Sequence, residues 1–252
     1  MPTEFTGKVA FITGGATGIG RAAALQLAAQ GASVMVADVA LEAAKQTAAD
    51  CVAAGAAALP IACNVRDDGQ VAAAVRACVD TFGRLDIAIN AAGIGGSEVR
   101  TADYDPADWD AVIDINLTGV WRSMRHEIPA MLKKQSGCIV NVASVAGLNG
   151  FPRHPAYSAS KHGVVGLTRT AALEYGRKGL RINALCPGFT LTPMVQQMLD
   201  AGLPKEELAA RVPLGRLGTP EEIAASALYL CSSAAAFMIG HALVVDGGIV
   251  AG

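Results

Sequence analysis

The chain has 252 residues, a formal net charge of −2 and a hydrophobic fraction of 52%. This length fits a single α/β domain, and the near-neutral charge gives no electrostatic footprint for nucleic acid or an anionic membrane. No apolar run approaches the roughly 18 residues that span a bilayer, and the first residues lack the pattern of a secretory signal. We therefore expect a cytoplasmic protein whose partner is a small molecule.

The six cysteines are scattered, with no Cys-x-x-Cys pair and no histidine cluster near any of them. This distribution is typical of reduced, mostly buried thiols in a cytoplasmic enzyme. We expect no metal site.

Short apolar runs alternate with helical patterns along the whole chain. Strands are expected over residues 8–13, 33–38, 58–63, 87–90, 138–142, 180–185 and 242–245, and helices over 21–30, 41–54, 67–82, 106–134, 157–176 and 220–233. Strands that are apolar on both faces and separated by helices indicate a parallel sheet covered on both sides. This is the doubly wound, Rossmann-type α/β fold, whose ligands bind beyond the carboxyl ends of the strands.

One long insert interrupts the alternation at about residues 189–218, within a single dinucleotide-binding domain spanning residues 1–252. It contains Pro193, Pro204 and Pro213 and several apolar side chains. Long inserts in compact domains are usually functional, so we predict a mobile lid over the site. The same apolar side chains could equally form a subunit contact.

A glycine-rich segment, Thr13-Gly-Gly-Ala-Thr-Gly-Ile-Gly20, lies between the first expected strand and the first helix. Glycines there let backbone N–H groups approach a pyrophosphate at the start of the helix. Asp38 ends the second strand, where a carboxylate accepts hydrogen bonds from the ribose of NAD and repels the 2′-phosphate of NADP. Neither Thr17 nor Val39 supplies a cation for that phosphate, so we predict NAD, with NADP less favoured. Asp38 could also cap the following helix.

Tyr157 and Lys161 stand four residues apart on an expected helix, and Ser144 precedes them at the end of an apolar strand. Residues at this helical spacing share one face, so a phenol and an ammonium reach the same volume. The ammonium would lower the pKa of the phenol from about 10 toward working pH, which suits proton exchange with an alcohol or ketone oxygen. Two unrelated neighbours on a helix would show the same spacing, so the pair depends on its context.

Five ordered motifs supply that context. They are the glycine motif, Asn90-Ala-Ala-Gly93, Asn116 in Asp114-Ile-Asn-Leu-Thr118, the set of Ser144, Tyr157 and Lys161, and Pro187-Gly188 with Thr192. The ending from Gly240 to Gly248 also matches. With these motifs the chain resembles the short-chain dehydrogenase/reductase family over nearly its whole length, in the compact single-domain branch.

The resemblance implies an NAD-dependent alcohol dehydrogenase or carbonyl reductase, with direct hydride transfer between a secondary alcohol carbon and the nicotinamide. Tyr157 would be the acid/base, and Lys161 would lower its pKa and hold the ribose. Ser144 would hydrogen-bond the reacting oxygen, and Asn116 would bind a water that resupplies the proton. The same resemblance assigns cofactor contacts to Gly14, Thr17, Gly18, Ile19, Gly20, Asp38, Asn64, Val65, Asn90, Ala91, Gly93, Tyr157, Lys161, Pro187, Gly188, Thr190 and Thr192. Asn64, Ala91 and Thr190 depart from the more usual residue types at these positions.

Offsets from the motifs place the substrate pocket at Gly95, Ala146, Leu148, Phe151, His154, Phe189, Met194 and Met198. None of these is Arg or Lys, which favours a neutral, apolar or cyclic alcohol or ketone, although Arg153 lies nearby. His154 could equally be a surface histidine in a loop.

Two alternatives stay open. One is a 3-oxoacyl-thioester reductase of the same family, and the other is a non-catalytic dinucleotide-binding sensor. The family commonly assembles through the helices here near 106–134 and 157–176 and through the C-terminal strand. The resemblance therefore also implies a homotetramer.

Overall fold

A seven-stranded parallel sheet forms the centre of the computed structural model, which describes residues 4–251. Its strands are β1 (Val9–Thr13), β2 (Ser33–Asp38), β3 (Ala58–Ala62), β4 (Ile87–Asn90), β5 (Gly137–Val142), β6 (Leu180–Pro187) and β7 (Ala242–Val245). They lie in the order β3-β2-β1-β4-β5-β6-β7, and every neighbouring pair is parallel. The doubly wound α/β fold predicted from the sequence is confirmed. The order reverses between β1 and β4, and ligands of such sheets bind beside this point.

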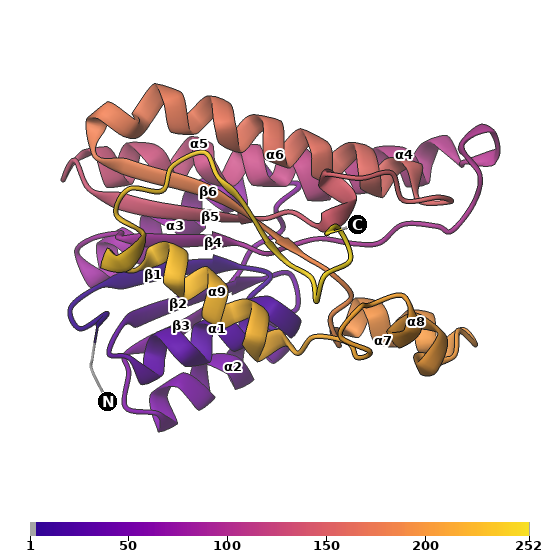
Figure 1. Cartoon of the computed structure of the whole chain (residues 1–252). Coiled ribbons are helices and arrows are strands. Elements are labelled where there is room, and N and C mark those ends of the chain that lie inside the picture. The colour runs from indigo at the N-terminus through magenta and orange to yellow at the C-terminus, as the bar shows by residue number, and fades with distance from the viewer. Residues whose placement is uncertain (1–3, 252) are drawn as a thin grey trace.

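Helices cover both faces of the sheet (Figure 1). One layer consists of α1 (Gly18–Ala29), α2 (Leu41–Ala53) and α9 (Pro220–Cys231). The other consists of α3 (Asp68–Phe82), α5 (Gly119–Leu132) and α6 (Pro155–Tyr175), with α4 (Pro106–Ile113) beside α6. Successive strand residues face opposite layers, so Ile12 packs against the first layer and Phe11 against the second, and both are fully buried. Strands apolar on both faces require this double cover.

The prediction of a single helix over residues 106–134 is wrong in one respect. A π-helical turn at Asp114–Thr118 separates α4 from α5. Asn116 lies in that turn. Its buried side chain forms two hydrogen bonds with the backbone of Ile94. The wider turn accommodates this contact, and π-bulges are frequent at functional sites.

The expected insert at residues 189–218 holds two helices, α7 (Pro193–Asp200) and α8 (Lys205–Ala210). They enclose a small core of their own, made of Val195, Leu208, Val212 and Leu217. Figure 1 shows both helices at one end of the sheet, beyond β6. The segment is therefore ordered, and its movement as a lid stays a prediction.

Candidate active site

A cleft of about 420 Å³ opens where β1 and β4 end, and its floor is the glycine-rich turn. Gly14 has a φ of +64°, and a Cβ atom there would lie 2.6 Å from the backbone nitrogen of Ala92. A Cβ on Gly20 would collide with the carbonyl oxygen of Gly14. Only glycine fits these two positions, and the backbone is thereby exposed to a ligand at close range.

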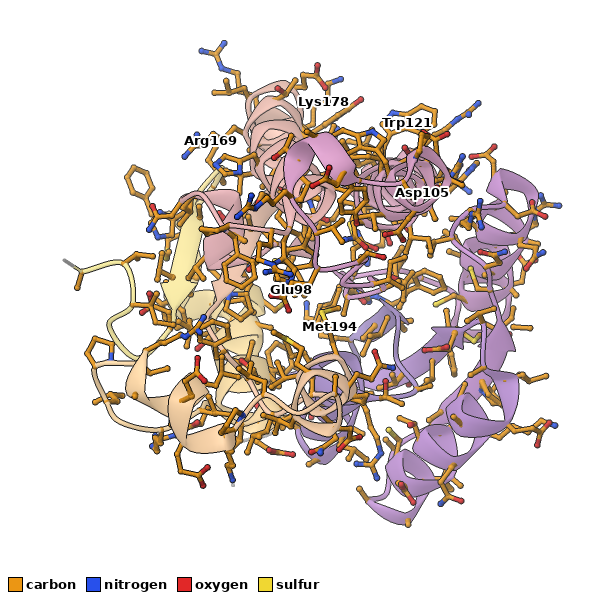
Figure 2. The ribbon with its side chains drawn as sticks, turned by 90° about the vertical axis from the view of Figure 1, so that its right-hand side faces the viewer. Glu98, Asp105, Trp121, Arg169, Lys178 and Met194 are labelled. Atoms are coloured by element: carbon orange, nitrogen blue, oxygen red, sulfur yellow. The ribbon has the colours of Figure 1, made fainter. Side chains whose placement is uncertain are left out.

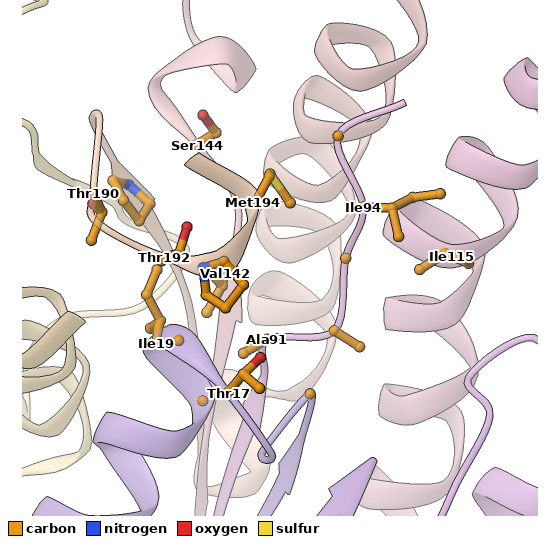
Figure 3. Close-up of a pocket in the computed structure, with 18 of the residues that line it drawn as sticks. Thr17, Ile19, Ala91, Ile94, Ile115, Val142, Ser144, Thr190, Thr192 and Met194 are labelled. Carbon is orange, nitrogen blue, oxygen red and sulfur yellow. The ribbon is translucent and has the colours of Figure 1, made fainter. Parts of the chain in front are cut away.

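The start of α1 faces this cleft without a capping side chain. Thr17 occupies the cap position in an extended conformation, and its hydroxyl makes no capping hydrogen bond. The first N–H groups of the helix are thus free to bind an anion. Figure 3 shows Thr17 and Ile19 at this helix start, beside the pocket. A pyrophosphate fits this position, because both the N–H groups and the helix dipole favour negative charge.

Asp38 ends β2 at the far side of the cleft and is half-buried. One carboxylate oxygen accepts from the N–H of Ala16 at 3.0 Å and the other from the N–H of Ala40 at 2.9 Å. The cap residue of α2 is Ala40, so Asp38 does not itself cap the helix. Each oxygen keeps a lone pair for a further donor, such as a ribose hydroxyl. Among the described lining residues, Lys161 supplies the one cation of the cleft.

The structure brings together all but one of the cofactor contacts expected from the sequence. The residues that line the cleft are Gly14, Thr17, Gly18, Ile19, Gly20, Asp38, Asn64, Val65, Ala91, Gly93, Tyr157, Lys161, Pro187, Gly188, Thr190 and Thr192. Asn90 is the exception: its side chain points into the protein and is 1% exposed, which contradicts a cofactor contact through that side chain. Its amide nitrogen donates to Glu127 Oε2 at 3.1 Å and to Asn141 Oδ1 at 2.9 Å.

Several apolar residues that the sequence reasoning missed also line the cleft, and three of them show why. Ile94 follows β4, Ile115 lies in the π-helical turn and Val142 ends β5 (Figure 3). Each stands at or just beyond the carboxyl end of a strand or in a break between helices. Because ligands of such sheets bind beyond the carboxyl ends of the strands, this position could have identified them from the sequence.

The predicted acid–base residues meet at one side of the cleft, where β5 ends and α6 begins. Ser144 and Tyr157 both line this side of the cleft, and the Ser144 hydroxyl acts to lower the pKa of the phenol. The Lys161 ammonium lies 5.6 Å from the centre of the Tyr157 ring and donates to the carbonyl of Val142 at 2.8 Å. Ser144 Oγ also accepts from the N–H of Ala146 at 3.1 Å. These contacts fix a hydroxyl pair beside a cation.

Asn116 lies behind this set and does not line the cleft. Its Oδ1 accepts from the N–H of Ile94 at 2.8 Å, and its Nδ2 donates to the Ile94 carbonyl at 2.9 Å. A Cβ on Gly93 would stand 3.2 Å from Asn116 Oδ1 and 3.7 Å from Lys161 Nζ. Gly93 therefore leaves open the space between the amide and the ammonium. A water bound there by Asn116 stays a prediction.

The expected lowering of the tyrosine pKa is wrong for the structure as it stands. Burial raises the pKa of the Tyr157 phenol, and the hydrogen bond from Ser144 only opposes that rise. Burial also lowers the pKa of Lys161 to about 8, because a desolvated ammonium loses its hydration. At the phenol, the loss of water therefore outweighs the opposing contribution of Ser144.

A second chamber, of about 840 Å³, adjoins the cleft at Ser144 and Tyr157. The predicted substrate residues that line it are Gly95, Ala146, Phe151, His154, Phe189, Met194 and Met198. Leu148 does not line the chamber, contrary to the prediction, because it packs against the core between the sheet and the layer of α3, α5 and α6. Phe151 forms a wall between two other rings, with its centre 4.4 Å from His154 and 6.1 Å from Phe189.

The two charged residues that line the described chamber, Glu98 and Arg211, each form an ion pair with a neighbouring residue. Arg153 contacts Glu98 at 3.2 Å, so it is engaged within the chain. Arg211 of the segment after α8 also lines the chamber, which the sequence reasoning missed, and it contacts Glu207 at 2.7 Å. Figure 2, which views the end of the sheet, shows Glu98 and Met194 near the centre of this face. Among the described residues that line the chamber, no unpaired arginine or lysine is therefore present to bind an anionic substrate.

All six cysteines are buried free thiols. Within residues 4–251, no group of three or more His, Cys, Asp or Glu side chains is placed to hold a metal ion. The same described part of the chain has no helix of the length and apolar character needed to cross a membrane.

Comparison with known proteins agrees with this geometry. A family model described as "Enoyl-(Acyl carrier protein) reductase" matches residues 14–250. The chain is 45% identical to a cyclohexanol dehydrogenase of Acinetobacter sp. (strain SE19), covering 98% of this chain and 96% of that protein. It is 38% identical to a 3-oxoacyl-(acyl-carrier-protein) reductase of Thermotoga maritima, covering 97% and 98%. The crystal structure of levodione reductase superposes with a TM-score of 0.94 at 41% identity, over 97% of this chain and 98% of that one. The chain therefore belongs to the short-chain dehydrogenase/reductase family.

Proposed function

We propose that the protein is an NAD-dependent dehydrogenase that interconverts cyclic secondary alcohols and their ketones. The observation that carries the proposal is the position of Ser144 and Tyr157, which line both the dinucleotide cleft and the apolar chamber. An alcohol in the chamber can present its oxygen to these hydroxyls and its carbon to the cleft. Proton transfer and hydride transfer then occur at one place.

In alcohol oxidation each side chain of the site has a separate role. Tyr157, as the phenolate, takes the hydroxyl proton of the substrate, while Ser144 hydrogen-bonds the same oxygen. A nicotinamide bound in the cleft would supply the acceptor for the hydride that leaves the substrate carbon. Lys161 stabilises the phenolate, and Asn116 and Gly93 border the space through which Tyr157 would exchange its proton with solvent. Ketone reduction is the reverse.

Asp38 supports NAD over NADP. Its carboxylate lies at the cleft, the neighbouring Val39 is 74% exposed and apolar, and no described cation other than Lys161 lines the cleft. A 2′-phosphate would meet a negative charge there without a counter-ion.

The chamber supports a neutral ring as substrate. Aromatic and methionine side chains wall it, and its charges are paired within the chain. The relatives named cyclohexanol dehydrogenase and levodione reductase agree with a cyclic substrate.

The test compares steady-state oxidation of cyclohexanol with NAD⁺ and with NADP⁺ for the wild type and Tyr157→Phe. We expect turnover with NAD⁺ in the wild type and a loss of at least about 10³-fold in the variant, with NADH binding by fluorescence nearly unchanged. Retained turnover in Tyr157→Phe would refute the assigned acid/base. Equal efficiency with NADP⁺ would refute the role of Asp38. Binding of NADH without turnover of any alcohol by the wild type would favour the sensor.

A 3-oxoacyl-thioester reductase is the second candidate, favoured by the Thermotoga maritima relative. An acidic carrier protein would need unpaired cations near the chamber mouth, whereas Arg153 and Arg211 are both paired. Turnover of an acetoacetyl thioester with NADPH, at higher kcat/KM than cyclohexanol with NAD⁺, would decide for this candidate.

We also propose a cytoplasmic homotetramer. Apolar side chains on two surfaces support the assembly, namely Trp109 and Trp121 on α4 and α5, and Leu173, Phe237 and Ile239 around the end of α6. Leu173 is 82% exposed, which is costly unless a subunit covers it. The free buried thiols fit a reducing compartment. Light scattering of the purified protein tests the mass, and a monomer would contradict the assembly.

A further inference from the structure

We propose that His154 is a hydrogen-bond acceptor that selects cyclic alcohols carrying a second hydroxyl, on a ring carbon other than the one oxidised. The inference rests on the proposed function, since it names the class of alcohol that the same site would take. His154 is half-buried and lines the chamber on the wall formed by Phe151 and Phe189.

The Pro152 carbonyl determines which nitrogen of the His154 imidazole carries the proton. Nδ1 of His154 lies 3.1 Å from the carbonyl oxygen of Pro152. A carbonyl oxygen can only accept, so Nδ1 is the donor. In the neutral ring Nε2 then carries a lone pair and is itself an acceptor. Within the described chain no group pairs with this nitrogen.

The ring is also held in position. Phe151 stacks against it at an interplanar angle of 31°, and the N–H of His154 donates to the Phe151 carbonyl at 3.2 Å. The preceding residue, Arg153, donates to the Glu98 carbonyl at 3.2 Å and pairs with its carboxylate. Arg153 has a φ of 68°, a left-handed conformation that a non-glycine residue adopts only where its contacts hold it. A preorganised acceptor selects better than a mobile one.

The other polar groups of the chamber have partners or water. Glu98 is paired with Arg153 and Arg211 with Glu207. Asn149 and Gln197 line the chamber but are exposed, so solvent satisfies them in the absence of substrate. His154 is half-buried beside the aromatic wall, so its unpaired Nε2 is the acceptor with most to gain from a ligand. A hydroxyl can donate to it, whereas a ketone, an ether or a C–H group cannot.

The acceptor and the phenol line the same chamber. His154 occupies the cap position of α6, and Tyr157 lies in the first turn of that helix. The N–H of Ser158 donates to the His154 carbonyl at 3.0 Å, which joins the cap to this turn. A six-membered ring can therefore present one hydroxyl to Tyr157 and another to His154.

The experiment measures kcat/KM with NAD⁺ for cyclohexanol and for the cis and trans isomers of cyclohexane-1,3-diol and cyclohexane-1,4-diol. In the wild type we expect at least one diol to exceed cyclohexanol by about 10-fold. In His154→Phe and His154→Ala, which lack the acceptor, we expect this ratio to fall to about one. His154→Gln should keep part of the preference, because its amide oxygen accepts a hydrogen bond.

His162→Phe is the matched control. His162 lies on the same helix, and its Nδ1 likewise pairs with a carbonyl, that of Ser158 at 2.9 Å, but it is exposed and does not line the chamber. This variant should keep the wild-type ratio. The inference is overturned if the wild type oxidises cyclohexanol without preferring a diol, or if both acceptor-free variants keep the preference. A wild type that oxidises none of these alcohols refutes the proposed function itself.

Discussion

Glu127 of α5 is fully buried, and its ionisation should set the pH dependence of stability. Its Oε2 accepts from the Asn90 amide at 3.1 Å, and Oε1 has no hydrogen-bond partner within the described structure. Burial raises the pKa of this carboxyl from its ordinary 4.5 to about 8, and the bond from Asn90 only partly opposes that rise. The folded protein therefore holds a proton here that the unfolded chain releases above pH 4.5.

The direction of the effect follows from proton binding. Between pH 4.5 and about 8 the folded state binds more protons at Glu127 than the unfolded state, so the free energy of unfolding falls as the pH rises. Each pH unit costs about 1.4 kcal/mol, which amounts to about 4 kcal/mol from pH 5 to pH 8. Glu127→Gln stays neutral and hydrogen-bonds Asn90 through its amide oxygen. At pH 8 the free energy of unfolding of this variant, relative to that of the wild type, should therefore be higher than at pH 5 by up to that amount.

Urea unfolding at pH 5, 6, 7 and 8, at one protein concentration, measures the difference between wild type and Glu127→Gln. Glu222→Gln is the control, because Arg216 holds the pKa of the exposed Glu222 at about 2 and this carboxyl stays ionised throughout the range. The difference for Glu222→Gln should therefore be constant with pH. A constant difference for Glu127→Gln as well would show that Glu127 is ionised in the folded protein, and the reasoning from its burial would be refuted.

Three further predictions concern the active site. Asp38→Asn should reduce the preference for NAD⁺ over NADP⁺ by about 10-fold, equivalent to about 1.4 kcal/mol, in the ratio of the two kcat/KM values. Gly14→Ala should abolish NADH binding by fluorescence titration, because its Cβ would meet Ala92, whereas Gly150→Ala, with open space around it, should bind normally. Alcohol oxidation should accelerate as the pH rises toward about 8, because more of Tyr157 becomes phenolate while Lys161 still carries its charge, and ketone reduction should show the opposite trend in initial rates.

The strands and most helices could be predicted because their patterns are local. A strand apolar on both faces, such as β2, can only lie inside a covered sheet, and its bounds agree with those expected. Helices α7 and α8 were missed, although Thr192 caps α7 and Pro193 takes its first position, both ordinary signals of a helix start. They are short and pack on a small local core, so they left no long periodic pattern to read.

Asn90 shows where residue type is not enough. An amide at the end of a strand suits a cofactor contact and a buried network equally well. The strand register decides between them, since Asn90 pairs with Thr13 across β1 and β4 and points into the helical layer that holds Glu127. Glu127 lies 37 residues along the chain from Asn90. No local pattern connects two such positions, and only the packed structure reveals the contact.

The two cavities separate the chemistry from substrate choice. Lys161 lines the cleft and not the chamber, so a substrate that reaches Tyr157 meets hydroxyl groups and no ammonium. The proposed proton transfer would depend on residues at the end of β5 and in α6, whereas Phe151 and His154 line the chamber and not the cleft. Changes at Phe151 and His154 can therefore alter which ring binds while leaving the acid–base set intact. Under the proposed function, substrate selection therefore belongs to the chamber wall.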